Sequence, residues 1–253
     1  MSGSVHSART SRGSTIPCAR VLPDREAIGD FAAFGVEAFT TTRAAGSFNT
    51  AASLPVAEVM GRWYALADGL GTVVPRFATA RQVHGDRVVV HGAEWEGWLR
   101  IAAADGHVGS VRGTALAVTV ADCVPIFIAH PSGATALLHS GWRGTAAGIL
   151  DRGIEALQRL GLRTADLRVH FGPAICGACY EVSPDVFRQL TKTPASAPAR
   201  VDLRALLADR ARTLGIRQIT TSPFCTRCHN DRFFSHRAGD DGRQVAVISS
   251  CEL

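Results

Sequence analysis

The chain has 253 residues and a mass of 26.8 kDa, enough to bury the core of one large domain or two small ones. Hydrophobic residues make up 46% and charged residues 19%, which is typical of a globular protein and excludes a disordered one. No apolar run approaches the roughly 18 residues of a membrane-spanning helix. The net charge of +5 comes from scattered arginines without interleaved aromatic residues, so we expect neither a membrane nor a nucleic-acid partner.

The cysteine count and the first residues indicate the compartment. Seven cysteines are too few for a disulfide scaffold in a chain of this length, and they favour metal binding or catalysis in a reducing compartment. The N-terminal stretch is rich in Ser and Arg and lacks the apolar segment of a secretory signal. We predict a disordered leader over 1–27, a single domain over 28–253 and a cytoplasmic location.

Apolar, β-branched runs alternate with helical patterns along the chain. Strands are predicted over Val88–Val90, Ala115–Val120, Val124–Ala129, Ala134–Leu138, Leu167–Phe171 and Gln244–Ser249. Helices are predicted over Thr145–Leu160, from the Ser183-Pro184 cap onward, and over Asp202–Leu214. The mixture predicts an α/β or α+β fold, in which one layered domain has a mixed sheet covered by helices.

Three polar residues interrupt or follow these apolar strands. Cys123 lies between two hydrophobic runs, His139 follows the next run, and His84 precedes the first predicted strand. Two imidazoles and a thiolate form a known zinc donor set that leaves a fourth position open for water. The alternative is that each histidine is an ordinary core or loop residue and Cys123 a small buried apolar side chain. Spacing alone leaves these two interpretations open.

Other patterns compete with this site. The segment Cys225–His229 fits the haem-attachment pattern C-x-x-C-H, which we disfavour because no export signal is present. The pairs Cys176/Cys179 and Cys225/Cys228 suggest a four-cysteine zinc knot only weakly, because 46 positions separate Cys179 from Cys225. The sequence has no dinucleotide-binding, P-loop, zincin or serine-hydrolase motif.

Five blocks in fixed order carry a family resemblance across about two thirds of the chain. They are RQVHGDRV (81–88), TVADCVPIFI (119–128), LHSGWRGTAAGI (138–149), GPAICGACYEV (172–182) and CT…FFSHR…GRQVAVI (225–248). With them the sequence resembles the laccase-domain purine nucleoside phosphorylase family. Its YfiH-like members were earlier described as multicopper polyphenol oxidases or peptidoglycan-editing factors.

The resemblance implies a function and a metal site. It implies one catalytic zinc held by His84, Cys123 and His139, with copper as the alternative metal. It further implies phosphorolysis of adenosine, inosine, guanosine and S-methyl-5′-thioadenosine, and deamination of adenosine, so that purine nucleosides and phosphate are the expected partners. Asp122 is the candidate for proton transfer or ligand orientation, with a purely structural role as the alternative. Arg143 is the candidate for binding phosphate, with an ion pair to a neighbouring residue as the alternative.

Three further residues are candidates for substrate binding. Trp142 could stack on a base, with a buried packing role as the alternative. Arg43 matches the start of the family pattern less specifically, and His236 belongs to the last matched block. The sequence departs from the family pattern at Ser47–Ala52, which puts the choice of nucleoside in doubt but not the metal site. Cys176, Cys228 and His229 are additional donors for which a second metal is an option.

Two other functions remain as alternatives. One is a copper-dependent polyphenol oxidase, disfavoured because multicopper chemistry needs many clustered imidazoles and the chain has nine histidines. The other is a Cys–His hydrolase acting on peptidoglycan precursors, in which His139 would activate Cys123 as the nucleophile.

Overall fold

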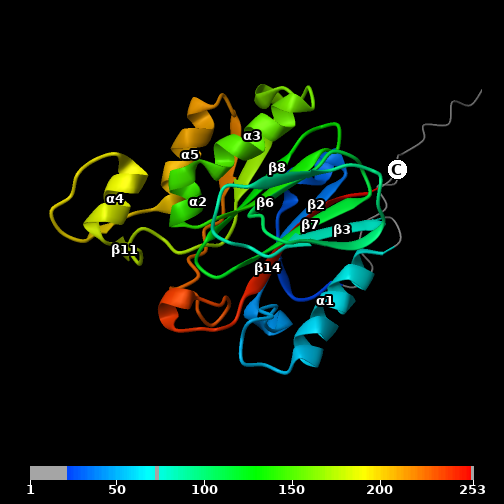
Figure 1. Ribbon diagram of the computed structural model, residues 1–253, viewed down its shortest axis with the longest axis horizontal. Helices are drawn as coiled ribbons and strands as arrows, with labels where there is room; N and C mark the ends of the chain where they lie inside the picture. Colours follow the sequence, from blue (N-terminus) through cyan, green and yellow to red (C-terminus); the bar gives the residue numbers. More distant parts are fainter. Residues whose placement is uncertain (1–21, 72–73, 252–253) are drawn as a thin grey trace, which may run out of the picture.

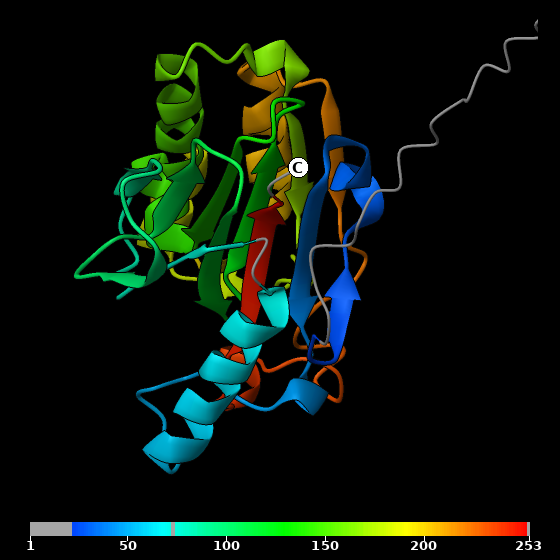
Figure 2. The same ribbon diagram turned by 90° about the vertical axis from the view of Figure 1, so that its right-hand side faces the viewer.

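Two six-stranded sheets pack face to face between layers of helices (Figure 1). The computed structural model describes residues 22–71 and 74–251. The first sheet has the order β1 (Arg25–Ala27), β2 (Val36–Thr41), β14 (Gln244–Ser250), β7 (Thr114–Val120), β3 (Arg76–Ala80) and β5 (Gly97–Ile101). Its first four strands are antiparallel neighbours, whereas β3 runs parallel to both β7 and β5. Figure 2 shows β14, in red, beside β2, in blue.

The second sheet is also mixed. Its order is β13 (Gln218–Thr221), β10 (Arg168–Phe171), β8 (Val124–Ala129), β9 (Thr135–Ser140), β6 (Gly106–Gly109) and β4 (Val88–His91). The edge pairs β13–β10 and β6–β4 are parallel, and the three inner pairs are antiparallel. A separate two-stranded ribbon joins β11 (Glu181–Val182) to β12 (Ala199–Arg200).

Helices cover the outer face of each sheet. α1 (Val56–Leu70) packs Trp63 and Leu66 against the first sheet. The second sheet is covered mainly by α3 (Ile149–Arg159) and α5 (Leu203–Thr213). The remaining helices are α2 (Trp142–Ala147), α4 (Pro184–Thr191) and the 3₁₀ turns η1 (Gly29–Phe34), η2 (Arg43–Ala45), η3 (Thr164–Asp166) and η4 (His236–Ala238). No helix in the described ranges is long and apolar enough to cross a membrane.

The predicted mixed α/β class is confirmed, but the structure has two large sheets where the sequence suggested one. The inner faces meet through fully buried side chains such as Leu116 of β7 and Phe127 of β8. An apolar strand that is buried on both faces does not reveal whether a helix or another strand covers it. The sequence pattern therefore could not distinguish these two arrangements.

Two predicted boundaries differ from the structure by three residues. The helix predicted over 145–160 begins at Trp142 and is divided at Gly148, whose φ of +85° ends α2 and precedes α3. Residues 1–21 of the predicted leader lie outside the described residues. Its remaining part includes β1, which pairs with β2, so regular structure begins before residue 28.

Three loops carry the chain from the first sheet to the second. Residues 81–87 join β3 to β4, residues 102–105 join β5 to β6, and residues 121–123 join β7 to β8. We call these loops the three crossovers. They bring chain segments from both sheets to one region, where the candidate site lies.

Candidate functional site

His84, Cys123 and His139 converge although they are far apart in the sequence. Their ligand atoms, one from each side chain, all lie within 4.8 Å of one another. His84 and Cys123 lie on two of the crossovers, whereas His139 lies near the end of β9, the strand whose end the sequence also placed at this histidine. The two imidazole rings meet edge to face with 4.8 Å between their centroids.

The crossover at residues 102–105 supplies a buried carboxylate, Asp105, that shapes the turn at His84. Its oxygens accept hydrogen bonds from the backbone N–H groups of three successive residues, at 3.1, 2.8 and 2.8 Å for Val83, His84 and Gly85. His84 adopts a left-handed conformation with φ of +59°, which is uncommon for a residue with a side chain. The three hydrogen bonds compensate for that conformation and fix the direction of the His84 side chain.

Asp105 also orients the second imidazole of the cluster. Its Oδ1 lies 2.9 Å from Nδ1 of His139. When Nδ1 donates to this carboxylate, Nε2 of His139 is the ring nitrogen that remains available to a metal. A carboxylate behind a ligating histidine is the usual arrangement in metal sites.

The cluster is electrostatically coupled. Burial raises the pKa of the Cys123 thiol, but the neighbouring His139 and His84 lower it more, to about 6. Burial lowers the pKa of His139, and the Cys123 thiolate and the Asp105 carboxylate together raise it to about 9. The protein therefore stabilises Cys123 as a thiolate, the form that binds metals and acts as a nucleophile.

Close packing around the sulfur leaves room for no larger residue at Gly141. A Cβ at this position would lie 2.9 Å from Sγ of Cys123 and 3.4 Å from Cδ2 of His84. The glycine therefore permits the start of α2 to approach the cluster. Two imidazoles, a thiolate and an orienting carboxylate fit a divalent ion such as zinc with one position left for solvent or substrate.

Two pockets open onto the cluster. One has a volume of about 310 Å³, and the other, with a volume of about 630 Å³, extends toward α1 and the first sheet. His84, Cys123 and His236 line both pockets. The cluster therefore lies where a ligand occupying either space could reach it.

Arg143 and Trp142 line the smaller pocket from the first turn of α2. The Arg143 guanidinium is exposed and lies 4.4 Å from the centroid of the Trp142 ring. Arg143 has no ion-pair partner within the described ranges. An unneutralised guanidinium at the pocket wall suits an anion such as phosphate.

Asp122 is buried next to Cys123, and both of its carboxylate oxygens have partners. Oδ1 accepts a hydrogen bond of 2.6 Å from the Thr226 hydroxyl, and Oδ2 accepts one of 2.7 Å from the backbone N–H of Arg237. These contacts connect the β7–β8 crossover to the segment 225–238. They favour a positioning role for Asp122 over proton transfer.

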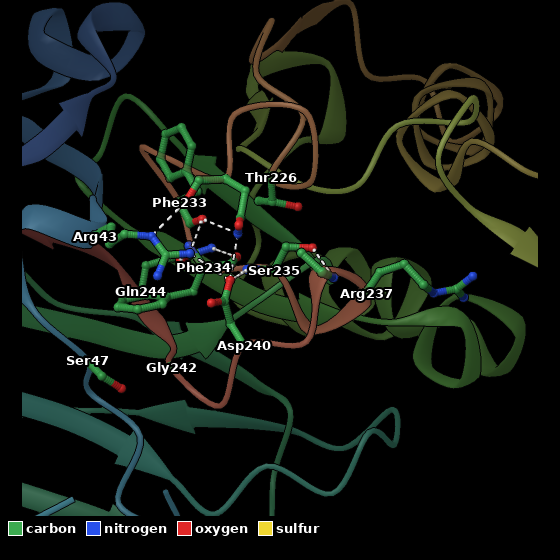
Figure 3. A network of polar contacts seen from close by, with 12 residues as sticks. Arg43, Ser47, Thr226, Phe233, Phe234, Ser235, Arg237, Asp240, Gly242 and Gln244 are labelled. Carbon is green, nitrogen blue, oxygen red and sulfur yellow. Dashed lines mark hydrogen bonds and ion pairs between the residues drawn. The ribbon is translucent and has the colours of Figure 1, made fainter.

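Arg43, a predicted substrate-binding residue, does not line either pocket and instead organises the loop after Asn230 (Figure 3). It forms an ion pair of 2.6 Å with Asp240 and donates a hydrogen bond of 2.8 Å to the carbonyl of Asn230. Its guanidinium lies 4.4 Å from the centroid of the Phe234 ring. Arg43 thus acts at a distance from the pockets, by holding the loop that carries His236.

Two residues of the site were missed by the sequence analysis. Asp105 carries no motif signal, because its partners are backbone groups and one histidine that lies 34 positions away. Tyr180 lines the smaller pocket, where burial and the Cys123 thiolate raise the pKa of its phenol. It belongs to the matched block at 172–182, which was the only available signal for it.

The fold and the cluster define a two-sheet α/β protein with a candidate metal centre built from two histidines and a cysteine. The chain belongs to the family described as "Multi-copper polyphenol oxidoreductase laccase", which matches residues 39–251. The resemblance predicted from the five sequence blocks is thereby confirmed.

The chain is similar to proteins named purine nucleoside phosphorylase and adenosine deaminase, and to a protein of known crystal structure. A protein named purine nucleoside phosphorylase from Streptomyces coelicolor is 35% identical over 190 residues, covering 72% of this chain and 78% of that protein. A protein named adenosine deaminase RL5, from an unknown prokaryotic organism, is 30% identical over 234 residues, covering 80% and 88%. The crystal structure of YlmD from Geobacillus stearothermophilus is 26% identical, with a TM-score of 0.82 and coverage of 93% and 99%.

Proposed function

We propose that the protein is a zinc-dependent purine nucleoside enzyme that cleaves nucleosides with phosphate and also deaminates adenosine. The observation that carries the proposal is the convergence of His84, Cys123 and His139 at a point shared by two pockets. The names of the relatives support the substrate class, since proteins called purine nucleoside phosphorylase and adenosine deaminase cover most of the chain.

His84, Cys123 and His139 would hold the zinc ion. When bound, zinc supplies a Lewis acid that lowers the pKa of water toward neutrality. The contribution of the chain is to present two imidazole nitrogens and a thiolate in a fixed arrangement, and Asp105 maintains the required tautomer of His139. The left-handed turn at His84 and the glycine at 141 keep the donors close together.

Phosphorolysis forms a bond from a phosphate oxygen to C1′ of the ribose and breaks the bond from C1′ to N9 of the purine. The departing base keeps the electron pair and must receive a proton. We assign phosphate binding to Arg143, whose exposed guanidinium borders the smaller pocket. Trp142 beside it offers a flat apolar surface for a base or ribose.

Tyr180 is our candidate for the proton donor. A tyrosine phenol is protonated at neutral pH, and the upward shift of its pKa by burial and the Cys123 thiolate is in the same direction; Tyr180 lines the same pocket as Arg143. A group that donates a proton must lie within the pocket and be protonated at the working pH. Tyr180→Phe should lower the rate of base release and leave zinc binding unchanged.

A Cys–His hydrolase is the second candidate, because the geometry pairs a Cys123 thiolate with a cationic His139 in the absence of metal. In that case activity would persist in the presence of a chelator. Multicopper chemistry is less consistent with the donor set, because this cluster has two imidazoles and the other cysteine-containing cluster of the described ranges has none.

The test is a product scan with the zinc-loaded protein. Adenosine and inosine are incubated with and without phosphate, and free base, ribose 1-phosphate and ammonia are measured. We expect free base and ribose 1-phosphate only with phosphate, and ammonia from adenosine without it. The absence of base release from the zinc-loaded protein with phosphate would refute the phosphorylase, and chelator-resistant peptide hydrolysis would establish the alternative.

A further inference from the structure

A second cluster of metal-binding side chains lies outside the site described above. The sulfur atoms of Cys176, Cys179, Cys225 and Cys228 all lie within 4.8 Å of one another. The sulfurs of Cys179 and Cys228 are 3.5 Å apart. The separation of 46 positions between the two pairs made this cluster a weak expectation from the sequence. The fold nevertheless brings the two pairs together.

Backbone contacts bring the two Cys-x-x-Cys segments together. Ala174 and Cys225 form an isolated parallel bridge, and the N–H of Thr226 donates to the carbonyl of Ala174 at 3.2 Å. The position of one pair against the other is therefore set by main-chain hydrogen bonding. The four thiols meet because the segments are aligned, independently of any bond between the sulfurs.

The backbone also stabilises negative charge on one of the sulfurs. Sγ of the buried Cys225 accepts hydrogen bonds from the N–H groups of Cys176, at 3.3 Å, and Cys228, at 3.4 Å. Donors aimed at a sulfur favour its thiolate form, which is the form that binds a metal. One N–H comes from each Cys-x-x-Cys segment, so both segments contribute to this arrangement.

We propose that these four cysteines form a second metal site, a structural zinc tetrathiolate distinct from the His84–Cys123–His139 cluster. Four sulfurs close the tetrahedral coordination sphere of zinc and leave no position for water, which is the pattern of structural sites. With Zn–S distances of about 2.3 Å, the sulfurs of such a site are ~3.8 Å apart. The observed limit of 4.8 Å requires only a small contraction of the cluster.

The location of this cluster gives the second metal a structural purpose. Asp122 lies between the two cysteine pairs and the first cluster. Its carbonyl accepts a hydrogen bond of 3.1 Å from the N–H of Ile175, and its carboxylate accepts one of 2.6 Å from the Thr226 hydroxyl. Ile175 precedes Cys176, and Thr226 follows Cys225. A zinc ion that joins the two pairs would thus hold the wall of the smaller pocket, including Tyr180, against the β7–β8 crossover.

The test counts zinc in purified variants prepared with added zinc under reducing conditions. Wild type should hold two zinc ions per chain, and Cys228→Ser should hold one. Cys228→His is the matched variant: it replaces the sulfur with another zinc donor at an exposed position, so it should retain two. Cys123→Ala should retain the tetrathiolate zinc and lose the other, which separates the two sites.

A full zinc content in Cys228→Ser would overturn the proposal. So would an intact mass showing that the four cysteines are oxidised to disulfides in the protein isolated under reducing conditions. Because zinc is counted without any assay of turnover, failure of the nucleoside reaction would leave this result unaffected.

A measurement on wild type keeps the proposal testable if Cys228→Ser does not fold. Cys228 is exposed, so burial alone would not protect it from alkylation by iodoacetamide. With zinc bound, we expect its alkylation to be at least about tenfold slower than after removal of zinc by a chelator. Equal rates with and without the chelator would refute the site.

Discussion

Asp105 and His139 are joined twice, once through the backbone and once through their side chains. The backbone N–H of His139 donates to the carbonyl of Asp105 at 2.7 Å, and its Nδ1 lies 2.9 Å from the Asp105 carboxylate. The same carboxylate accepts the N–H groups of the turn that carries His84. One buried side chain thus determines the placement of both imidazoles in the cluster.

Replacing Asp105 with Asn should therefore weaken metal binding. The amide removes the negative charge and puts an NH₂ donor in place of one oxygen. At Oδ1 this removes the acceptor of His139 and His84, and at Oδ2 it removes that of Val83 and Gly85. We expect zinc affinity to fall about 10- to 100-fold, measured by competition with a chromogenic chelator. Asp86→Asn is the control, because that carboxylate lies at the surface and forms an ion pair of 3.4 Å with Arg152. Equal affinities in the two variants would contradict the role of Asp105.

Gly141→Ala tests the packing around Cys123. The added methyl group would lie 2.9 Å from the sulfur, a distance that forces Cys123 or the start of α2 to move. We expect loss of zinc from the His84–Cys123–His139 cluster and of activity, with destabilisation of about 1–3 kcal/mol by chemical denaturation. Gly61→Ala in α1 is the matched control, since no atom of the described residues outside the backbone of its own helix lies within 4 Å of the added methyl group. That control should be neutral or stabilising by up to about 1 kcal/mol.

Arg143→Ala should affect phosphate and spare the metal. Loss of a charged hydrogen-bond donor to phosphate costs about 1.5–3 kcal/mol, which corresponds to roughly a 10- to 150-fold fall in kcat/KM for phosphate. Zinc content should not change, because Arg143 is not a donor in either cluster. Arg163→Ala, on the surface beside Asp166, serves as the control. An unchanged dependence on phosphate would remove Arg143 from the proposed function.

His107 should make stability sensitive to acid. Burial and the neighbouring His91 lower its pKa to about 3, against an opposing effect of Asp105. In the unfolded chain its pKa is about 6.5, so below that pH the unfolded state binds a proton that the folded state does not. The contribution of His107 to the free energy of unfolding is therefore present above about pH 6.5. It is lost at about 1.4 kcal/mol per pH unit as the pH falls from about 6.5 toward 3.

His107→Gln should flatten this dependence while keeping a polar group beside His91, whose Nε2 lies 2.9 Å from Nδ1 of His107. The measurement is the free energy of unfolding by denaturant at about pH 6.5 and about pH 4.5, in wild type and variant. Parallel pH dependences in the two proteins would show that His107 does not retain its low pKa.

The sequence predicted much of the second sheet and less of the first. Val124–Ala129 matches β8 in full, because an apolar run this short and this rich in β-branched and aromatic residues favours a strand over a buried helix. β2, β3 and α1 were not predicted. The helix α1 includes Gly61 and Gly69 and exposes the apolar side chains of Val56 and Tyr64, which obscures its helical pattern.

The candidate site could also be predicted in part from the sequence. His84, Cys123 and His139 were selected because each interrupts or follows an apolar strand, and the structure brings the three together. Asp105 was not accessible and the four-cysteine cluster was only a weak expectation, because both depend on how distant segments align. Pairing across 46 positions is a property of the tertiary fold, and local patterns carry no trace of it.

The crossovers have a consequence for how the protein responds to proteases. His84 and Cys123 of the cluster, and Asp105 that orients it, all lie on crossovers between the two sheets. Cleavage of one crossover would therefore break a connection between the sheets directly beside the cluster. Bound zinc would hold the ends of such a cut chain in place. The exposed stretch around Val83 should therefore resist digestion in the zinc-loaded protein and become the preferred cleavage site after zinc is removed.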